Sequence, residues 1–331
     1  MRVSAVATDI FLPEFRAWDT GATRGGCLAT LLGKSRDCSR VAWTLCKTPL
    51  QVVQTSRMPA SPPARPFSAF QPRGVRGVLT DIDDTLTTAG AITPEALQAL
   101  ADLKAAGLPV IAITGRPMGW SEPFARAWPI DAIVAENGAV ALFRSGDGLK
   151  IEYAQDEATR RINAQRLALV AVRIQREIPG ATLARDSAGR VTDIAIDHAE
   201  FAHLPSAQIA QVVALIRDEG MCATVSSIHI NGWFGTHDKL SGARWIVQRL
   251  LGRDLDAESA HWVYVGDSTN DQLMFGHFAN SVGVANLLDF AAELTVWPRF
   301  ITRQPRGAGF AEVAAALLPP LRLRAAEAGA A

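Results

Sequence analysis

Two aspartates stand two positions apart directly after a short apolar run. Residues 77–80, Gly-Val-Leu-Thr, have the length and β-branched character of a buried strand, and Asp81 and Asp83 follow it. In an extended segment, side chains two positions apart point to the same side. Two neighbouring carboxylates repel unless a cation lies between them or one takes up a proton. The pair therefore indicates cation binding or proton transfer, and the alternative is an acidic surface turn, since Asp-Asp-Thr suits turns.

Two further apolar runs end in polar clusters. Residues 109–114 lead into Thr114, Gly115 and Arg116, and residues 262–265 lead into the segment Gly-Asp-Ser-Thr-Asn-Asp at 266–271. The carboxyl ends of parallel strands lie on one edge of a sheet, where ligands bind. Lys239 opens a helix with an apolar stripe, just before the third cluster in the chain. We therefore expect carboxylates, a hydroxyl, an amine and small glycines to meet in one crevice.

The elements that must position these residues follow an α/β pattern from residue 75. Strands and helices alternate through residue 135, with a helix from Thr93 as cap to Gly107, and a hairpin follows at 140–153. Residues 155–236 carry two helical stripes, with Ser206 as the expected cap of the second, and strand candidates without strict alternation. The parallel pattern resumes at 237, with a last helix at 310–318, and ends at 322. The prediction is a Rossmann-like parallel sheet at 75–154 and 237–322 with an inserted α+β cap at 155–236, and a frayed tail at 323–331.

Residues 1–74 differ from the rest of the chain. They hold ten basic and four acidic residues, show weak periodicity, and include the run Ser-Pro-Pro-Ala-Arg-Pro at 61–66, which cannot continue a helix or a central strand. We expect a disordered extension, or upstream sequence that is not translated, with Met58 as an alternative start. An organelle transit peptide is a more specific alternative, but the four acidic residues in 1–74 count against it, because transit peptides are poor in acidic residues.

Composition excludes several classes of protein. The 331 residues carry no net charge, so no overall field suggests a nucleic-acid or membrane partner. Hydrophobic residues make up 48% of the chain, which is ordinary for a globular protein. The four cysteines form no Cys-x-x-Cys pair, and after residue 46 only Cys222 remains. This usage predicts a reduced, cytoplasmic protein without disulfides.

The ordered motifs resemble the haloacid dehalogenase superfamily of aspartyl-phosphate phosphotransferases. Asp-x-Asp-x-Thr at 81–85, Thr114, Lys239 and Gly-Asp-x-x-x-Asp at 266–271 match its four motifs in order, and the resemblance covers residues 75–320. The runs Thr-Gly-Arg-Pro, Glu-Asn-Gly-Ala and Gly-Asp-Ser-Thr-Asn-Asp are similar to those of subfamily IIB, which includes Cof-type, sucrose-phosphate and mannosyl-3-phosphoglycerate phosphatases. The resemblance implies an α/β fold with a cap between the second and third motifs.

The resemblance also implies a role for each matching residue. Asp81 would be the nucleophile and Asp83 the general acid and base. Mg²⁺ would be held by Asp81, the carbonyl of Asp83 and Asp267. The phosphoryl group would be bound by Thr114, Gly115, Lys239 and Asn270, with Asn270 supporting either the loop or the phosphate. Asp271 would orient Lys239 or a metal-bound water, Thr85 would shape the first loop, and Arg116 would contact substrate or pair with Glu136.

These roles imply an Mg²⁺-dependent phosphatase that hydrolyses a small phosphorylated metabolite, a sugar phosphate in the first instance. Asp83 favours phosphatases and mutases over dehalogenases, which lack a carboxylate there. A hexose phosphomutase and a phosphate-binding regulator without catalysis remain as alternatives. The motifs leave the exact substrate and the oligomeric state open.

Several polar residues of the cap region have two interpretations. His229, Asn231 and Trp233 alternate along one strand, so they face either the crevice or the core of the cap, and we expect the latter. His198 and His203 are too isolated to predict ligands. Asp186 and Arg190 flank a Ser-Ala-Gly turn and are interpreted as turn residues. The five arginines at 160, 161, 166, 173 and 176 are expected to form a solvated helix face.

Overall fold

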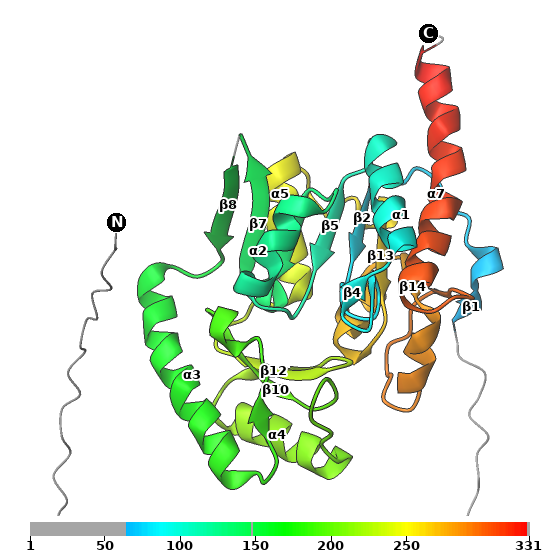
Figure 1. Ribbon diagram of the computed structural model, residues 1–331. Helices are drawn as coiled ribbons and strands as arrows, with labels where there is room; N and C mark the ends of the chain where they lie inside the picture. Colours follow the sequence, from blue (N-terminus) through cyan, green and yellow to red (C-terminus); the bar gives the residue numbers. More distant parts are fainter. Residues whose placement is uncertain (1–63, 147, 330–331) are drawn as a thin grey trace, which may run out of the picture. The chain divides into compact units, whose positions relative to one another are not determined.

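The computed structural model describes residues 64–146 and 148–329, and Figure 1 shows how they are arranged. A nine-stranded sheet has the order β1-β15-β14-β13-β2-β5-β6-β7-β8. Its strands are β1 (Arg65–Pro66), β2 (Gly77–Thr80), β5 (Val110–Ile113), β6 (Ala132–Ala135), β7 (Val140–Ser145), β8 (Gly148–Tyr153), β13 (Trp262–Gly266), β14 (Asn280–Gly283) and β15 (Phe300–Ile301). In this sheet order, every neighbouring pair from β1 as far as β6 is parallel. Strands β7 and β8 add an antiparallel hairpin next to β6. The predicted parallel α/β sheet is confirmed.

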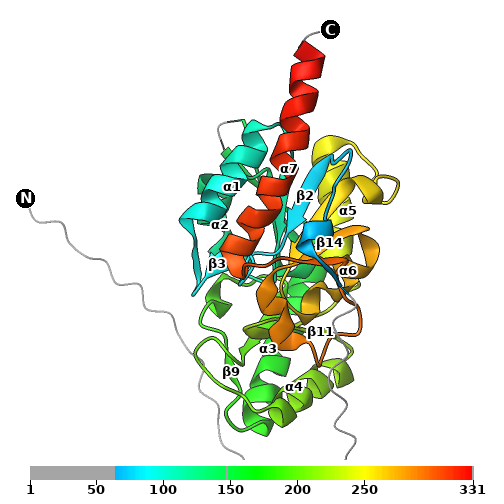
Figure 2. The same ribbon diagram turned by 90° about the vertical axis from the view of Figure 1, so that its right-hand side faces the viewer.

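Helices cover both faces of this sheet (Figure 2). On one face lie α1 (Pro94–Ala105), α2 (Met118–Ala127) and α7 (Arg306–Gly329), and on the other lie α5 (Lys239–Leu251) and α6 (Gln272–His277). The central strands β2, β5 and β6 are buried along their whole length, as expected for strands covered on both sides. Thr93 caps α1 as predicted, since its side chain accepts a hydrogen bond from the Ala96 amide.

A smaller α+β segment runs from Glu157 to Trp233, between β8 and α5. Helices α3 (Glu157–Glu177) and α4 (Ser206–Asp218) pack on a four-stranded antiparallel sheet of order β11-β12-β10-β9. Its strands are β9 (Thr182–Leu183), β10 (Asp193–Asp197), β11 (Cys222–Val225) and β12 (His229–Trp233). This segment has its own apolar core, centred on Ile174, Ile196 and Ile216. We call it the cap.

Short elements complete the fold. A two-stranded ribbon, β3 (Thr87–Thr88) and β4 (Ala91–Ile92), follows the Asp81–Asp83 segment. Six 3₁₀ turns are η1 (Phe67–Ala69), η2 (Glu136–Gly138), η3 (Ser187–Gly189), η4 (Ser259–His261), η5 (Thr269–Asp271) and η6 (Ala285–Phe290). Within the described part of the chain, no helix has the length and apolar character needed to cross a membrane.

The first described residues correct the expectation for 1–74. Residues 64–74 belong to the folded core, because β1 pairs with β15 and the side chains of Phe67 and Phe70 are buried. Phe70 packs edge-on against Phe300, with ring centroids 5.2 Å apart. Proline is tolerated here because β1 is an edge strand. The remainder of the predicted extension, residues 1–63, lies outside the described residues.

Two helix predictions also need correction. The last helix runs from Arg306 to Gly329, so the segment from 323 to 329, expected to be frayed, is helical. Ser206 is the first residue of α4 rather than its cap, and the capping position is held by Pro205, which makes no side-chain hydrogen bond.

Candidate active site

Three neighbouring strands deliver the predicted residues to one edge of the sheet. Strand β2 ends just before Asp81, β5 just before Thr114, and β13 just before Asp267. These strands are adjacent and parallel in the order β13-β2-β5, so their carboxyl ends meet. The Asp81 amide extends the ladder by donating to the Val265 carbonyl at 2.9 Å.

A buried lysine ties two of these carboxylates together. Lys239 Nζ donates to Asp81 Oδ1 and to Asp271 Oδ1, both at 2.7 Å, and its side chain is 3% exposed. Asp238 caps α5 through a capping box with Ser241, which fixes the first turn that carries Lys239. Close backbone contact seats this helix, because a Cβ on Gly242 would lie 2.6 Å from the Gly138 Cα. The predicted pairing of Asp271 with Lys239 is thus present.

Burial dominates the electrostatics of this cluster. Burial raises the pKa of Asp81 to about 7 although Lys239 lowers it. Burial alone would lower the pKa of Lys239, but Asp271 and Asp81 raise it above its ordinary value. The pKa of Asp267 is raised well above its usual range, first by burial and then by the charges of Asp81 and Asp271. Lys239 therefore stays charged, and the carboxylates hold an excess of negative charge that a cation would relieve.

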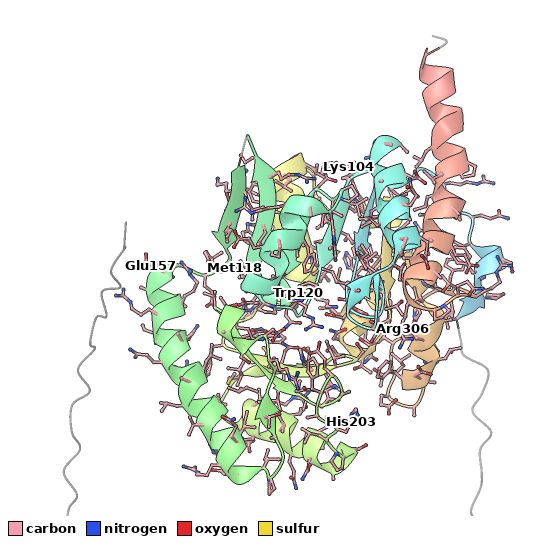
Figure 3. All side chains as sticks on the ribbon, viewed as in Figure 1. Lys104, Met118, Trp120, Glu157, His203 and Arg306 are labelled. Carbon is pink, nitrogen blue, oxygen red and sulfur yellow. The ribbon has the colours of Figure 1, made fainter. Side chains whose placement is uncertain are left out.

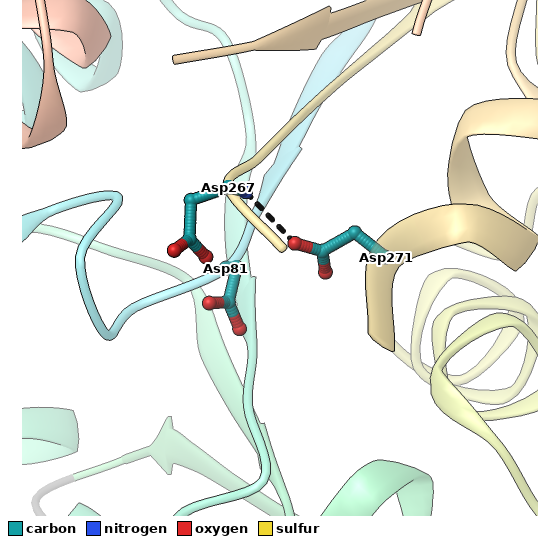
Figure 4. Close-up of side chains that lie close together, drawn as sticks. All are labelled: Asp81, Asp267 and Asp271. Atoms are coloured by element: carbon teal, nitrogen blue, oxygen red, sulfur yellow. Dashed lines mark hydrogen bonds between the residues drawn. The ribbon is translucent and has the colours of Figure 1, made fainter. Parts of the chain in front are cut away.

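The donor set fits a divalent cation at Asp81 and Asp267. Oxygens of Asp81, Asp267 and Asp271 lie within 4.8 Å of one another (Figure 4). Asp271 is already saturated, because Oδ1 accepts from Lys239 and Tyr264 and Oδ2 accepts from the amides of residues 267 and 268. Within the described ranges, the Asp267 carboxylate has no cationic partner and receives only two long contacts of 3.4 Å, from Thr85 Oγ1 and Asn286 Nδ2. Carboxylate oxygens of this kind suit Mg²⁺.

Asp271 instead shapes the loop between β13 and α6. Its Oδ2 accepts from the Asp267 amide at 2.8 Å, and a Cβ on Gly266 would lie only 2.4 Å from that oxygen. Position 266 therefore requires glycine, because the Asp271 carboxylate lies too close for a side chain there. Asn270 Oδ1 accepts from Ser268 Oγ at 3.0 Å, so in the structure its side chain supports this loop.

The segment after β5 contacts the other catalytic candidate. Arg116 Nε donates to both oxygens of Asp83 at 3.0 Å, while the Arg116 amide donates to Thr114 Oγ1, also at 3.0 Å. The predicted alternative that Arg116 pairs with Glu136 is wrong. The buried Glu136 carboxylate accepts from the amides of Met118 and Thr192 and thereby ties the core to the cap.

Arg116 also reaches two cap carboxylates. Its Nη2 donates to Glu200 Oε1 at 2.8 Å, and its Nη1 donates to Asp186 Oδ2 at 3.2 Å. Burial alone would lower the pKa of Arg116, but Asp83 and Glu200 raise it above its ordinary value. Asp186 was interpreted as a turn residue and Glu200 was not predicted, because both contacts join segments at least 70 residues apart.

Cap side chains form hydrogen bonds with the backbone of the predicted phosphate-binding loop. Arg190 Nη1 donates to the Gly115 carbonyl at 2.9 Å, and Asn231 Nδ2 donates to the same oxygen at 3.3 Å. Both side chains also bond to Asp193, and Arg190 is 2% exposed. The interpretation of Arg190 as only a turn residue is therefore wrong. We call the contact region between the core and the cap the seam. Figure 3 shows the side chains that fill it, with Trp120 of α2 on the core side.

The three alternating residues of β12 face the seam rather than the core of the cap. His229 Nε2 lies 2.9 Å from Glu200 Oε2, Asn231 contacts Gly115, and Trp233 Nε1 donates to the His237 carbonyl at 2.9 Å. The expectation that all three pack in the cap core is wrong, and that core takes Ile230 from the opposite face of the strand.

The arginines of α3 are less uniform than expected. Arg160 and Arg166 lie over the rings of Tyr153 and Phe234, 3.6 and 3.5 Å from the ring centres, and Arg173 pairs with Glu177 and Glu219. Long basic side chains often cover apolar surface in this way.

Comparison with known proteins agrees with this geometry. Residues 78–166 match the family model described as haloacid dehalogenase-like hydrolase. The match extends from β2 into α3, and over this part the chain is similar to the haloacid dehalogenase-like hydrolases. The α+β cap lies between Thr114 and Lys239, as predicted for the inserted cap. A search of curated protein sequences finds no match.

Solved structures share this fold at low sequence identity. A Thermoplasma acidophilum protein has a TM-score of 0.56 at 16% identity and covers 72% of this chain and 96% of its own. A putative HAD/COF-like hydrolase from Plasmodium vivax has a TM-score of 0.55 at 15% identity, with coverages of 74% and 95%. The sucrose-phosphatase from Synechocystis sp. PCC6803, solved with sucrose and phosphate, has a TM-score of 0.53 at 16% identity, with coverages of 73% and 97%.

Proposed function

We propose that this protein is a divalent-metal-dependent phosphatase that releases phosphate from a small phosphorylated metabolite through an aspartyl-phosphate intermediate. The observation that carries the proposal is the buried contact of Lys239 with Asp81 beside the buried carboxylate of Asp267. An amine, a nucleophilic carboxylate and a cation site at one sheet edge are the parts that phosphoryl transfer requires. The likeness to the fold of a sucrose-phosphatase supports a sugar phosphate as the first class of substrate to test.

Each residue has a task in this proposal. Asp81 attacks phosphorus, and the ester oxygen leaves as an alcohol with a proton from Asp83. Asp83 then takes a proton from water, which attacks the aspartyl-phosphate, so that phosphate leaves and both carboxyl groups return to their starting forms. Lys239, Thr114 and the Gly115 amide hold the phosphoryl oxygens.

The metal would be Mg²⁺, held by Asp81, Asp267 and the carbonyl of Asp83. When bound, it neutralises charge between the anionic nucleophile and the anionic phosphoryl group. The chain's own groups prepare this site: Asp271 fixes the loop that carries Asp267, and Thr85 contacts the Asp267 carboxylate. We propose a cytoplasmic location on the basis of cysteine usage alone.

The test is phosphate release from a panel of sugar phosphates with Mg²⁺, with Asp81→Asn as the inactive variant. We expect release that a chelator abolishes and that Asp81→Asn lowers by at least about a thousandfold, since loss of a nucleophile removes the whole covalent route. Asp102→Asn, the same change at a partly exposed position on α1, is the matched control and should retain activity.

The alternatives predict other results. A phosphomutase would release no phosphate but would become phosphorylated on Asp81 by a sugar bisphosphate. A regulatory binding protein would show neither release nor phosphoenzyme, and Asp81→Asn would leave its ligand binding intact.

A further inference from the structure

A cavity of about 410 Å³ opens beside Asp83. Core residues Asp83, Asp84 and Arg116 line one side, and cap residues Glu200, Phe201 and Ile228 line the other. If Asp83 protonates the leaving oxygen, as proposed above, that oxygen must come within hydrogen-bond distance of it. The organic part of the substrate must then occupy this cavity, whose size is within the range of small-molecule sites.

The charged residues that line this cavity are mostly acidic. Asp83, Asp84 and Glu200 contribute three carboxylates, and Arg116 is the cation among the described lining residues. Arg116 is already engaged, since Asp83 and Glu200 lie within 2.9 Å of its guanidinium and Asp186 lies at 3.2 Å. The nearby Arg306 likewise donates to Asp84 Oδ1 at 2.8 Å. A second anionic group on the leaving group would therefore meet carboxylates and no uncommitted cation among these residues.

Glu200 remains a good acceptor for hydroxyl groups. Burial alone would raise its pKa, but hydrogen bonds from His229 and Arg116 lower the pKa of Glu200 to about 2, so the side chain is charged at neutral pH. Its two oxygens accept from His229 and Arg116, which leaves lone pairs for further donors. Phe201, which also lines the cavity, is 55% exposed, and Arg185 lies over its ring with Cζ 3.7 Å from the ring centre. Carboxylate lone pairs accept hydrogen bonds from hydroxyl groups, so this side of the cavity suits a polyhydroxyl ligand.

We propose that this cavity binds an uncharged polyhydroxyl leaving group and that Glu200 is the residue that excludes leaving groups carrying a second anionic group. This inference rests on the proposed phosphatase function. It also disfavours the phosphomutase alternative, because a sugar bisphosphate would place its second phosphate against these carboxylates.

The test compares matched substrate pairs that differ only in one carboxylate. Glucitol 6-phosphate against 6-phosphogluconate, and glycerol 3-phosphate against 3-phosphoglycerate, each exchange a hydroxymethyl group for a carboxylate. Values of kcat/KM come from phosphate release, and inhibition constants come from competition with p-nitrophenyl phosphate. For the wild-type protein we expect both measures to favour the uncharged member by at least about tenfold, or about 1.4 kcal/mol.

Two further measurements isolate Glu200. Glu200→Gln should lower the preference at least about fivefold, whereas Glu219→Gln, a cap carboxylate that pairs with Arg173 away from the cavity, should keep the wild-type ratio. Since Glu200→Gln disturbs the contacts with Arg116 and His229, the wild-type preference is also measured against salt. It should decrease as ionic strength rises from about 0.01 to 0.5 M, because salt screens like-charge repulsion.

The outcomes separate this inference from the proposed function. Equal or better binding of the anionic members by the wild-type protein overturns the role of Glu200 while leaving the phosphatase proposal intact. A preference for the uncharged members that is insensitive to salt overturns the electrostatic reasoning. Failure to hydrolyse p-nitrophenyl phosphate and every sugar phosphate contradicts the phosphatase proposal itself.

Discussion

Replacing Arg190 by glutamine should destabilise the protein strongly. The Arg190 side chain is 2% exposed, and its Nη1 lies 2.9 Å from Oδ1 of Asp193, which is fully buried. Removing one partner of a buried ion pair leaves the other charge uncompensated and costs about 3–5 kcal/mol. Arg190→Gln should therefore lower the free energy of unfolding by this amount. The double variant Arg190→Gln/Asp193→Asn should recover most of it, because the unpaired charge at position 193 is then removed as well.

Urea unfolding, monitored by tryptophan fluorescence, measures the effect. The urea concentration at the midpoint should decrease, while the dependence of the free energy of unfolding on urea concentration stays constant. Arg173→Gln is the matched control: this arginine is 40% exposed on α3 and pairs with Glu177 and Glu219, so its loss should cost less than about 1 kcal/mol. The reasoning is refuted if Arg190→Gln unfolds within about 1 kcal/mol of the wild type, or if the double variant is no more stable than the single one.

Three further predictions follow from the buried charges and from the first strand. Lys239→Met should lower kcat/KM for phosphate release by about 10²–10³, the usual effect of losing one donor to the transition state. Burial, partly opposed by Arg190, raises the pKa of Asp193 to about 7, so the native state holds a proton that the unfolded chain releases. The free energy of unfolding should hence fall between pH 3.8 and about 7, and Asp193→Asn should flatten this dependence in urea titrations at several pH values. A chain that starts at Val75 loses buried Phe70 and should be less stable, by about 3 kcal/mol or more, than one that starts at Met58.

The sequence sufficed for the sheet edge because its signals are local. Each strand there is a run of four or five apolar or β-branched residues, and each ends directly at a polar side chain such as Asp81, Thr114 or Asp267. Parallel pairing then places these ends together without any knowledge of side-chain contacts. Lys239 was found in the same way, from the helix start that follows Asp238.

The seam between core and cap had no such signal. Arg116 contacts Glu200, 84 residues away, and Arg190 contacts Gly115, 75 residues away. Nothing in the local pattern around Arg190 distinguishes it from an ordinary turn arginine. The segment at 64–74 was misjudged for a different reason: its prolines suggested an extension, while the three-residue spacing of two phenylalanines was the available sign of burial.

The missed contacts converge on the segment Thr114–Arg116, and this has a physical consequence. In the proposed mechanism the Gly115 amide binds phosphate. The Gly115 carbonyl accepts hydrogen bonds from Arg190 and Asn231 of the cap. Arg116, the next residue, joins Asp83 to Glu200 of the cap. Any movement of the cap away from the sheet edge must break these bonds and release both the phosphate-binding loop and Asp83. The position of the cap and the order of the catalytic groups are therefore coupled through three consecutive residues, which explains why buried charges are concentrated at this seam despite their cost.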